Sequence, residues 1–234
     1  MIAKHLSALM AAALCLIVTN GCVAGEVLFY KVSRNYGHDG LLGRVNRREL
    51  ETRMFTHATW SERLYCNPYE PDIDETLEVH SNADGSRSLS HRLATPSLSR
   101  RIDWSISQRE QFDLKKKLDA VRITEHEIAL PAEVAKEIEL LWRTMLPGLL
   151  KEPTEPIVGE HRLIIHAPYI IALARDNNSV KTGSIAMAAY NTPAYVAFMG
   201  IVDDLIKVCD RGGSSADPIF RRLPDKIRHL RTRL

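Results

Sequence analysis

The 234-residue sequence has few aromatic side chains, little net charge and only one long apolar run. Aromatic residues make up 6% of the chain, so no platform for stacking nucleic-acid bases is indicated. The formal net charge of +2 is too small to predict polyanion binding by the surface as a whole. No apolar run after Val23 approaches the length of a membrane span. The sequence therefore argues against a nucleic-acid-binding protein and leaves only the N-terminus as a membrane-targeting segment.

The motifs of several enzyme classes are also missing. His126-Glu127 begins like a zinc-protease motif, but the second histidine would fall at position 130, where Leu130 stands. The chain has no Cys-x-x-Cys pair, no Gly-x-Ser-x-Gly elbow and no phosphate-binding loop. The stretch "GHDGLLG" lacks the glycine spacing of a dinucleotide site. We therefore assign no catalytic residue, no metal ligand and no cofactor from motifs.

Residues 1–24 have the order of a bacterial export signal. Lys4 precedes an uncharged run from Leu6 to Val18, whose length suits a secretory signal and is short for a membrane span. Two cleavage sites remain open. A cut before Cys22 would make this cysteine the lipid-attachment residue of a lipoprotein, whereas a cut near Ala24 would release a soluble chain. Both predict an exported protein of the periplasm or envelope.

Cleavage at either site leaves Cys66 and Cys209 as the only cysteines free to pair, because Cys22 is either lost or carries the lipid. An exported chain meets an oxidising compartment, and two thiols have only one possible pairing. A disulfide between them would close a loop of about 140 residues and contribute about 4–5 kcal/mol in the chain-entropy model. We predict this disulfide; the alternative is two unpaired, buried thiols.

The first half of the chain is rich in β patterns separated by turn signals. In "RSLSHRLA", Leu89, His91 and Leu93 alternate with polar residues, which indicates a half-buried strand. Similar patterns predict strands at 26–33, 49–60, 75–80 and 99–107. Together these segments predict an antiparallel meander with one solvated face.

The second half mixes helices and strands. A helix is predicted at 108–120, and a clearer one begins at Pro131 and keeps apolar residues on one face as far as Met145. Two apolar runs flank "RDNNSV" and predict a buried hairpin. Thr192 and Pro193 then supply the N-cap and first turn of another amphipathic helix. The fold class is thus α+β: an N-terminal antiparallel β-rich half, and a C-terminal half with two amphipathic helices flanking a buried β-hairpin.

We predict a single domain over residues 26–211, followed by a flexible break and a basic C-terminal tail over 212–234. Whether the two halves of the domain share one core stays open. A basic residue near anionic lipid contributes roughly 1 kcal/mol to binding, so the tail is a candidate element for contact with a membrane or an acidic partner. The alternative is a solubilising, frayed helix. The tail cations are Arg221, Arg222, Lys226, Arg228, Arg231 and Arg233.

The leading functional hypothesis is a non-enzymatic, exported envelope protein that binds a partner, expected to be another envelope protein. Membrane contact would come from a lipid anchor or from the basic tail. The alternative is a small periplasmic hydrolase whose histidine and carboxylate groups are assembled by folding. Its candidate residues are His38, Asp39, His57, His80 and His91. A nucleic-acid binder driven by the tail is disfavoured by the export signal.

Overall fold

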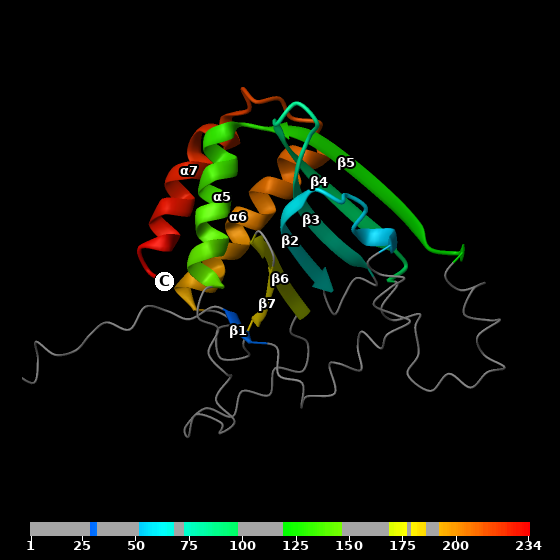
Figure 1. The fold of residues 1–234 in the computed structure, drawn as a ribbon, viewed down its shortest axis with the longest axis horizontal. Coiled ribbons are helices and arrows are strands. Elements are labelled where there is room, and N and C mark those ends of the chain that lie inside the picture. The colour runs from blue at the N-terminus through cyan, green and yellow to red at the C-terminus, as the bar shows by residue number, and fades with distance from the viewer. Residues whose placement is uncertain are drawn as a thin grey trace, which may run out of the picture.

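A computed structural model describes residues 29–31, 52–67, 73–97, 119–146, 169–176, 179–185 and 192–234. Within these ranges, seven strands form one antiparallel sheet and three long helices gather on one side of it (Figure 1). The strand order across the sheet is β1-β7-β6-β2-β3-β4-β5. This arrangement confirms the predicted α+β class.

Strands β2 to β5 form a meander in which each strand pairs with the next along the chain. The chain then passes through α5 and returns, so that β6 pairs with the free side of β2. β6 and β7 form the predicted hairpin, and β1 pairs with β7 at the edge. The strands are β1 (Phe29–Lys31), β2 (Trp60–Asn67), β3 (Asp74–Ser81), β4 (Arg87–Thr95), β5 (Arg122–Leu130), β6 (Tyr169–Asp176) and β7 (Ser179–Ile185).

The helices are α5 (Ala132–Met145), α6 (Pro193–Asp210) and α7 (Pro218–Arg231). The first two begin where their proline and capping residues predict. The Thr192 side chain accepts a hydrogen bond from the backbone N–H of Tyr195 at 3.2 Å, which satisfies one of the free donors at the start of α6. No helix among the described residues is both long and apolar enough to cross a membrane.

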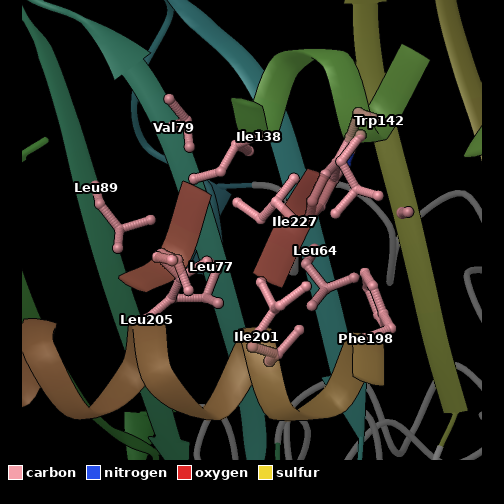
Figure 2. Close-up of a cluster of buried hydrophobic side chains, with 14 of the residues drawn as sticks. Leu64, Leu77, Val79, Leu89, Ile138, Trp142, Phe198, Ile201, Leu205 and Ile227 are labelled. Atoms are coloured by element: carbon pink, nitrogen blue, oxygen red, sulfur yellow. The ribbon is translucent and has the colours of Figure 1, made fainter. Parts of the chain in front are cut away.

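The main core lies between the sheet and the helices. Figure 2 shows α6 passing across the strands, with Leu205 beside Leu77 and Phe198 on the side of Leu64. Phe198 also meets Phe29 of β1 in an edge-to-face contact with ring centroids 5.5 Å apart. Ile138 of α5 and Ile227 of α7 enter the same layer. One apolar core therefore joins strands from both halves of the chain.

Helix α7 belongs to this core, although it lies in the segment predicted to be a basic tail. Phe220, Leu223, Ile227 and Leu230 are all buried, and they recur at helical spacing on one face. The connection between α6 and α7 includes Gly212, whose φ of +62° is a conformation that glycine adopts without strain.

Ion pairs attach the outer side of α7 to its neighbours. Lys226 lies 2.5 Å from Asp204 of α6. Arg228 and Arg231 both donate to Glu137 of α5, at 3.0 and 2.8 Å. Half of the tail cations thus have partners inside the domain. The other three, Arg221, Arg222 and Arg233, are exposed.

Two sequence-based strand assignments need correction. The strand predicted at 49–60 is wrong over its described part, because residues 52–54 form a helical turn and β2 begins only at Trp60. Strand β5 was missed, because its sequence, RITEHEIAL, carries three charged residues and a histidine. The strand predicted at 99–107 and most of the helix predicted at 108–120 lie outside the described residues.

The structure does not contain the predicted disulfide: Cys66 and Cys209 are both buried and free. Cys66 lies on β2, whereas the Cys209 thiol donates to the carbonyl oxygens of Leu89 on β4 and His126 on β5. β2 and β4 are two strand spacings apart, about 10 Å, and a disulfide requires Cα atoms within about 7 Å. Burial raises the pKa of both thiols to about 12, so both remain protonated at neutral pH.

Glu137 is the acidic residue that tests how firmly α7 is held. We expect Glu137→Gln to lower the free energy of unfolding by about 1–3 kcal/mol, because one of the two arginines then faces an amide N–H₂ instead of an acceptor and both lose the carboxylate charge. Glu133→Gln is the matched control on the same helix, since exposed Glu133 also contacts Arg228 but is screened by water. Urea unfolding measures both. Equal losses for the two variants would contradict an anchoring role for Glu137.

Candidate functional site

The face of the sheet opposite the helices, called here the second face, carries a row of polar side chains. Arg63, Glu78, Ser90 and Glu127 stand on β2, β3, β4 and β5 and are aligned by the strand register. Side chains alternate across a strand, so this row points away from the helices while its sequence neighbours Leu64, Val79, Leu89 and Ile128 point toward them.

Residues 52–59, called here the strap, lie against the second face because arginines of the sheet bind its carbonyl oxygens. Arg92 donates to the carbonyl of Arg53 at 2.9 Å, and Arg63 donates to that of His57 at 3.1 Å. Arg175 donates to the carbonyl of Ala58 at 2.7 Å. Guanidinium donors make stronger hydrogen bonds than neutral groups. These three bonds fix the backbone that carries His57.

Aromatic stacking adds to this attachment. The Arg63 guanidinium lies 4.6 Å from the ring centre of Phe55 and 4.2 Å from that of Trp60. Arg175 lies 4.3 Å from the Trp60 ring. Cation–π contacts of this kind stabilise by about 0.5–2 kcal/mol each. A small second core, which includes Met54 of the strap and Tyr65 of β2, buries the apolar part of this face.

Four side chains meet beneath the strap and form what we call the histidine–glutamate cluster: His57, Glu78, His80 and Glu127. The Nδ1 atom of His57 lies 2.5 Å from Oε1 of Glu78. The Nε2 atom of His80 lies 3.2 Å from Oε1 of Glu127, and Nε2 of His57 lies 3.8 Å from Oε2 of Glu127. The two imidazole rings are stacked in parallel with centroids 3.6 Å apart.

The cluster has a buried floor and an accessible rim. The side chains of Glu78 and His80 are both 4% exposed, whereas that of Glu127 is 43% exposed. Burial and the neighbouring His57 lower the pKa of His80, so its imidazole is neutral at physiological pH. Arg63 forms an ion pair with the other oxygen of Glu78 and compensates the charge of this buried carboxylate.

The structure brings together two of the residues proposed for a hydrolase and separates a third from them. His57 and His80 share the cluster. His91 lies on the helix side of the sheet, because it is three positions from Ser88, the cross-strand neighbour of His80. His38, Asp39 and the lipidation candidate Cys22 lie outside the described residues.

His91 has a structural environment of its own. Its Nδ1 atom lies 2.6 Å from Asp210 at the end of α6, and its Nε2 atom lies 2.9 Å from Glu75 of β3. Burial lowers the pKa of His91, but the hydrogen bonds to Glu75 and Asp210 outweigh this effect and the net pKa is raised. The charged imidazole therefore links α6 to the sheet.

Sequence reasoning missed the two carboxylates of the cluster. A usable signal was present in β3, where Thr76, Glu78 and His80 alternate with apolar residues and so share one face. For Glu127 no signal was available, because it meets His80 only through the pairings of β3 with β4 and of β4 with β5.

The arrangement supports two kinds of chemistry. A carboxylate beside an imidazole can exchange a proton with a ligand, as general acid–base groups do. Histidine nitrogens and carboxylate oxygens are also metal ligands. Two sets have all their ligand atoms within 4.8 Å of one another: His57, Glu78 and His80 on the floor, and His57, Glu125 and Glu127 at the rim.

Comparison of the chain with protein-family models, curated proteins and solved structures finds no match. The function is therefore argued from the geometry of the second face.

The link made by His91 predicts a pH-dependent contribution to stability. Because the folded-state pKa is raised above the ordinary 6.5, the stabilisation is fully present below pH 6.5 and is lost as the pH rises through the folded-state value. We expect His91→Gln to cost about 1–3 kcal/mol at acidic pH and less at alkaline pH, measured by urea unfolding from about pH 5.5 to about pH 9.

His126→Gln is the matched control, since exposed His126 lies opposite His91 in the strand register. The groups that face the His91 imidazole are Glu75 and Asp210, while the Cys209 thiol contacts the His91 backbone. Glu62, whose pKa is raised by burial to about 7, titrates in the same range, but it is common to all variants and cancels in the difference. A pH-independent cost of His91→Gln would show that the imidazole is uncharged.

Proposed function

We propose that the protein is an exported binding protein of the bacterial envelope, which holds another envelope protein on its second face. The export-signal pattern of residues 1–24 supports the location. The second face supports the binding role, because the helices cover the other face with an apolar core.

The observation that carries this proposal is the combination of buried floor and exposed rim. Ionisable groups at the centre of a sheet lower stability unless they are paired, and such groups gather at functional sites. Here Glu78 and His80 are buried, and polar residues around them reach the surface. The rim carries both signs of charge, with Glu125 and Glu127 on β5 and Arg175 on β6.

The second face also has an exposed apolar side chain that suits a protein partner. Val180 of β7 is 50% exposed and lies opposite Arg175 in the strand register. Arg175 contacts Trp60 on the second face, so Val180 shares that face. Interfaces between proteins combine such apolar contacts with a polar rim.

The basic C-terminal segment belongs to the same proposal. Arg221, Arg222 and Arg233 are exposed and have no partner among the described residues, so they are the tail cations that remain for an anionic membrane surface. Lys226, Arg228 and Arg231 are engaged with α5 and α6.

A periplasmic hydrolase is the second candidate, favoured by the 2.5 Å contact between His57 and Glu78. A carboxylate in this position can orient an imidazole that acts as a general base. The two functions differ in what they predict for His57→Ala: a hydrolase would lose turnover of a substrate, while a binding protein would have none to lose.

The first experiment on the proposal is the intact mass of the protein taken from its host's envelope. A chain beginning at Cys22 with acyl groups would make it a lipoprotein, and one beginning near Gly25 would make it a soluble exported protein. A chain still carrying Met1 would contradict export. In denaturant, we expect Cys66 and Cys209 to be alkylated without reduction, because both thiols are free in the structure. A requirement for reduction would restore the disulfide prediction.

Partner binding is tested by cross-linking and capture from native envelopes. We expect Val180→Glu to reduce the recovery of a reproducible partner about tenfold, equivalent to about 1.4 kcal/mol of binding free energy. Val196→Glu is the matched control, because Val196 is an exposed valine of similar exposure on α6. Capture of no partner, or equal losses for the two variants, would argue against the second face as the binding surface.

A further inference from the structure

We infer that the floor of the histidine–glutamate cluster binds one divalent first-row transition-metal ion, of which zinc is the type, through His57, Glu78 and His80. The inference rests on the proposed function, because it names a ligand for the second face, which is also the proposed partner-binding face. It is carried by the hydrogen-bond accounting of the two imidazoles, which leaves one buried nitrogen without a partner.

That nitrogen is Nδ1 of His80. Its other ring nitrogen, Nε2, faces Oε1 of Glu127 at 3.2 Å, and an ionised carboxylate can only accept a hydrogen bond. Nε2 therefore carries the proton and Nδ1 carries the lone pair. Nδ1 is buried and has no hydrogen-bond partner among the described residues. Metal-binding histidines commonly have this arrangement, in which a carboxylate accepts from one nitrogen and the ion takes the other.

His57 can supply the second nitrogen. Its Nδ1–H now donates to Oε1 of Glu78 at 2.5 Å, and an ion placed between these atoms would replace that proton. The displaced proton moves to Nε2 of His57, which lies 3.8 Å from Oε2 of Glu127. Glu127 then accepts from both histidines, one on each oxygen.

The third ligand is Oε1 of Glu78. Its second oxygen is held by Arg63, which positions the carboxylate and leaves Oε1 directed at His57. The ligand atoms offered by these three side chains lie within 4.8 Å of one another. An imidazole binds a metal in its ring plane, and the two rings are stacked in parallel, so an ion with bonds of about 2.0–2.2 Å requires the His57 ring to tilt out of the stack as the cluster closes.

The donor set selects the class of ion. Two imidazole nitrogens and one carboxylate oxygen form the His₂Glu combination that suits zinc and its neighbours, with the fourth position open to water or a partner's side chain. Magnesium and calcium prefer sets made wholly of oxygen. Glu78 and Glu127 contribute two negative charges near a divalent ion, although Glu78 shares its charge with the Arg63 guanidinium.

The rim set of His57, Glu125 and Glu127 is the competing arrangement. It offers one nitrogen, and both of its carboxylates are exposed to water. It also uses Glu127 as a ligand. If the ion binds the floor set instead, Glu127 accepts hydrogen bonds from the two imidazole rings. Glu78 and Glu125 therefore distinguish the two sets.

The test uses the full-length chain, stripped with a chelator and titrated calorimetrically with zinc chloride. We expect one ion per chain, a rise in the melting temperature with added zinc, and no binding of magnesium. His57→Ala should abolish binding; it alters the strap and no strand, so it keeps the fold. Glu127→Gln should weaken binding about 10–100-fold, as loss of a carboxylate behind a metal-bound histidine does.

Two control variants should bind zinc as the parent chain does. His126→Gln removes an exposed histidine adjacent in sequence to Glu127 but on the other face, and Glu125→Gln removes the carboxylate that only the rim set uses. Circular dichroism confirms that each variant is folded. Absence of zinc uptake by the parent chain, or full binding by His57→Ala, would overturn the inference. So would loss of binding on Glu125→Gln with retention on Glu78→Gln.

These outcomes separate the metal site from the proposed function. If zinc does not bind but Val180→Glu still loses the partner, the metal inference fails and the binding surface stands. If zinc binds at the floor and no partner is captured, the metal site stands and the partner proposal fails.

Discussion

Val79, Leu89 and Ile128 occupy matched positions on β3, β4 and β5, and the removal of this apolar row from water is the constraint on which the rest of the structure depends. A slip of one residue in any of these strands would turn its apolar side chains to the opposite face. The register is therefore strongly specified. The next row along the strands, Glu78, Ser90 and Glu127, is aligned by the same pairing and must face away from the helices. The candidate site is in this sense a geometric consequence of the core.

The second face is stabilised differently from the first. Its apolar cluster is small, and arginines supply much of the attachment of the strap. Arg63 makes four contacts here, because it pairs with Glu78, binds the carbonyl of His57 and stacks on both Phe55 and Trp60. A planar guanidinium can satisfy several partners at once, which a lysine cannot. The position of His57 over the cluster thus depends on a residue that is not itself a candidate ligand.

Local signals in the sequence predict the elements that have distinct ends. Helix α6 follows from Thr192 and Pro193, and the β6–β7 hairpin follows from two apolar runs around a polar turn. Strand β5 shows the limit of such local signals. Apolar residues alternate only at its end, at Ile128 and Leu130, and the exposed, charged positions before them hide the strand pattern. The strap shows a second limit of prediction from local sequence. Its mixture of β-forming and charged residues predicts a strand, yet three of its carbonyl oxygens are bound by arginine side chains, and among the described residues only that of Thr59 accepts from the backbone of a neighbouring strand.

The site is less predictable than the fold for a related reason. Two members, Glu78 and His80, lie two apart on one strand and could be placed on a common face from the sequence. Glu127 joins them through two strand pairings, and His57 joins through contacts made by arginines on three different strands. No local pattern contains such long-range contacts. The role of helix α7 also depends on long-range contacts. Its many cations predict a solvated tail, and only the packing of Leu223 and Ile227 shows that the helix completes the core.

The sheet finally separates two histidines with opposite chemistry. His91 is enclosed by two carboxylates, one at each ring nitrogen, so the charged imidazolium is the form that its surroundings stabilise. His80 has a carboxylate at only one nitrogen and another imidazole stacked on its ring, so burial and its neighbour favour the neutral form. A charged histidine can link two elements but has no lone pair to offer a ligand. A neutral histidine with one buried, unpartnered nitrogen adds little to stability and keeps that lone pair available. The number of carboxylates hydrogen-bonded to each ring, two for His91 and one for His80, therefore distinguishes the histidine that serves the fold from the one that is left to bind.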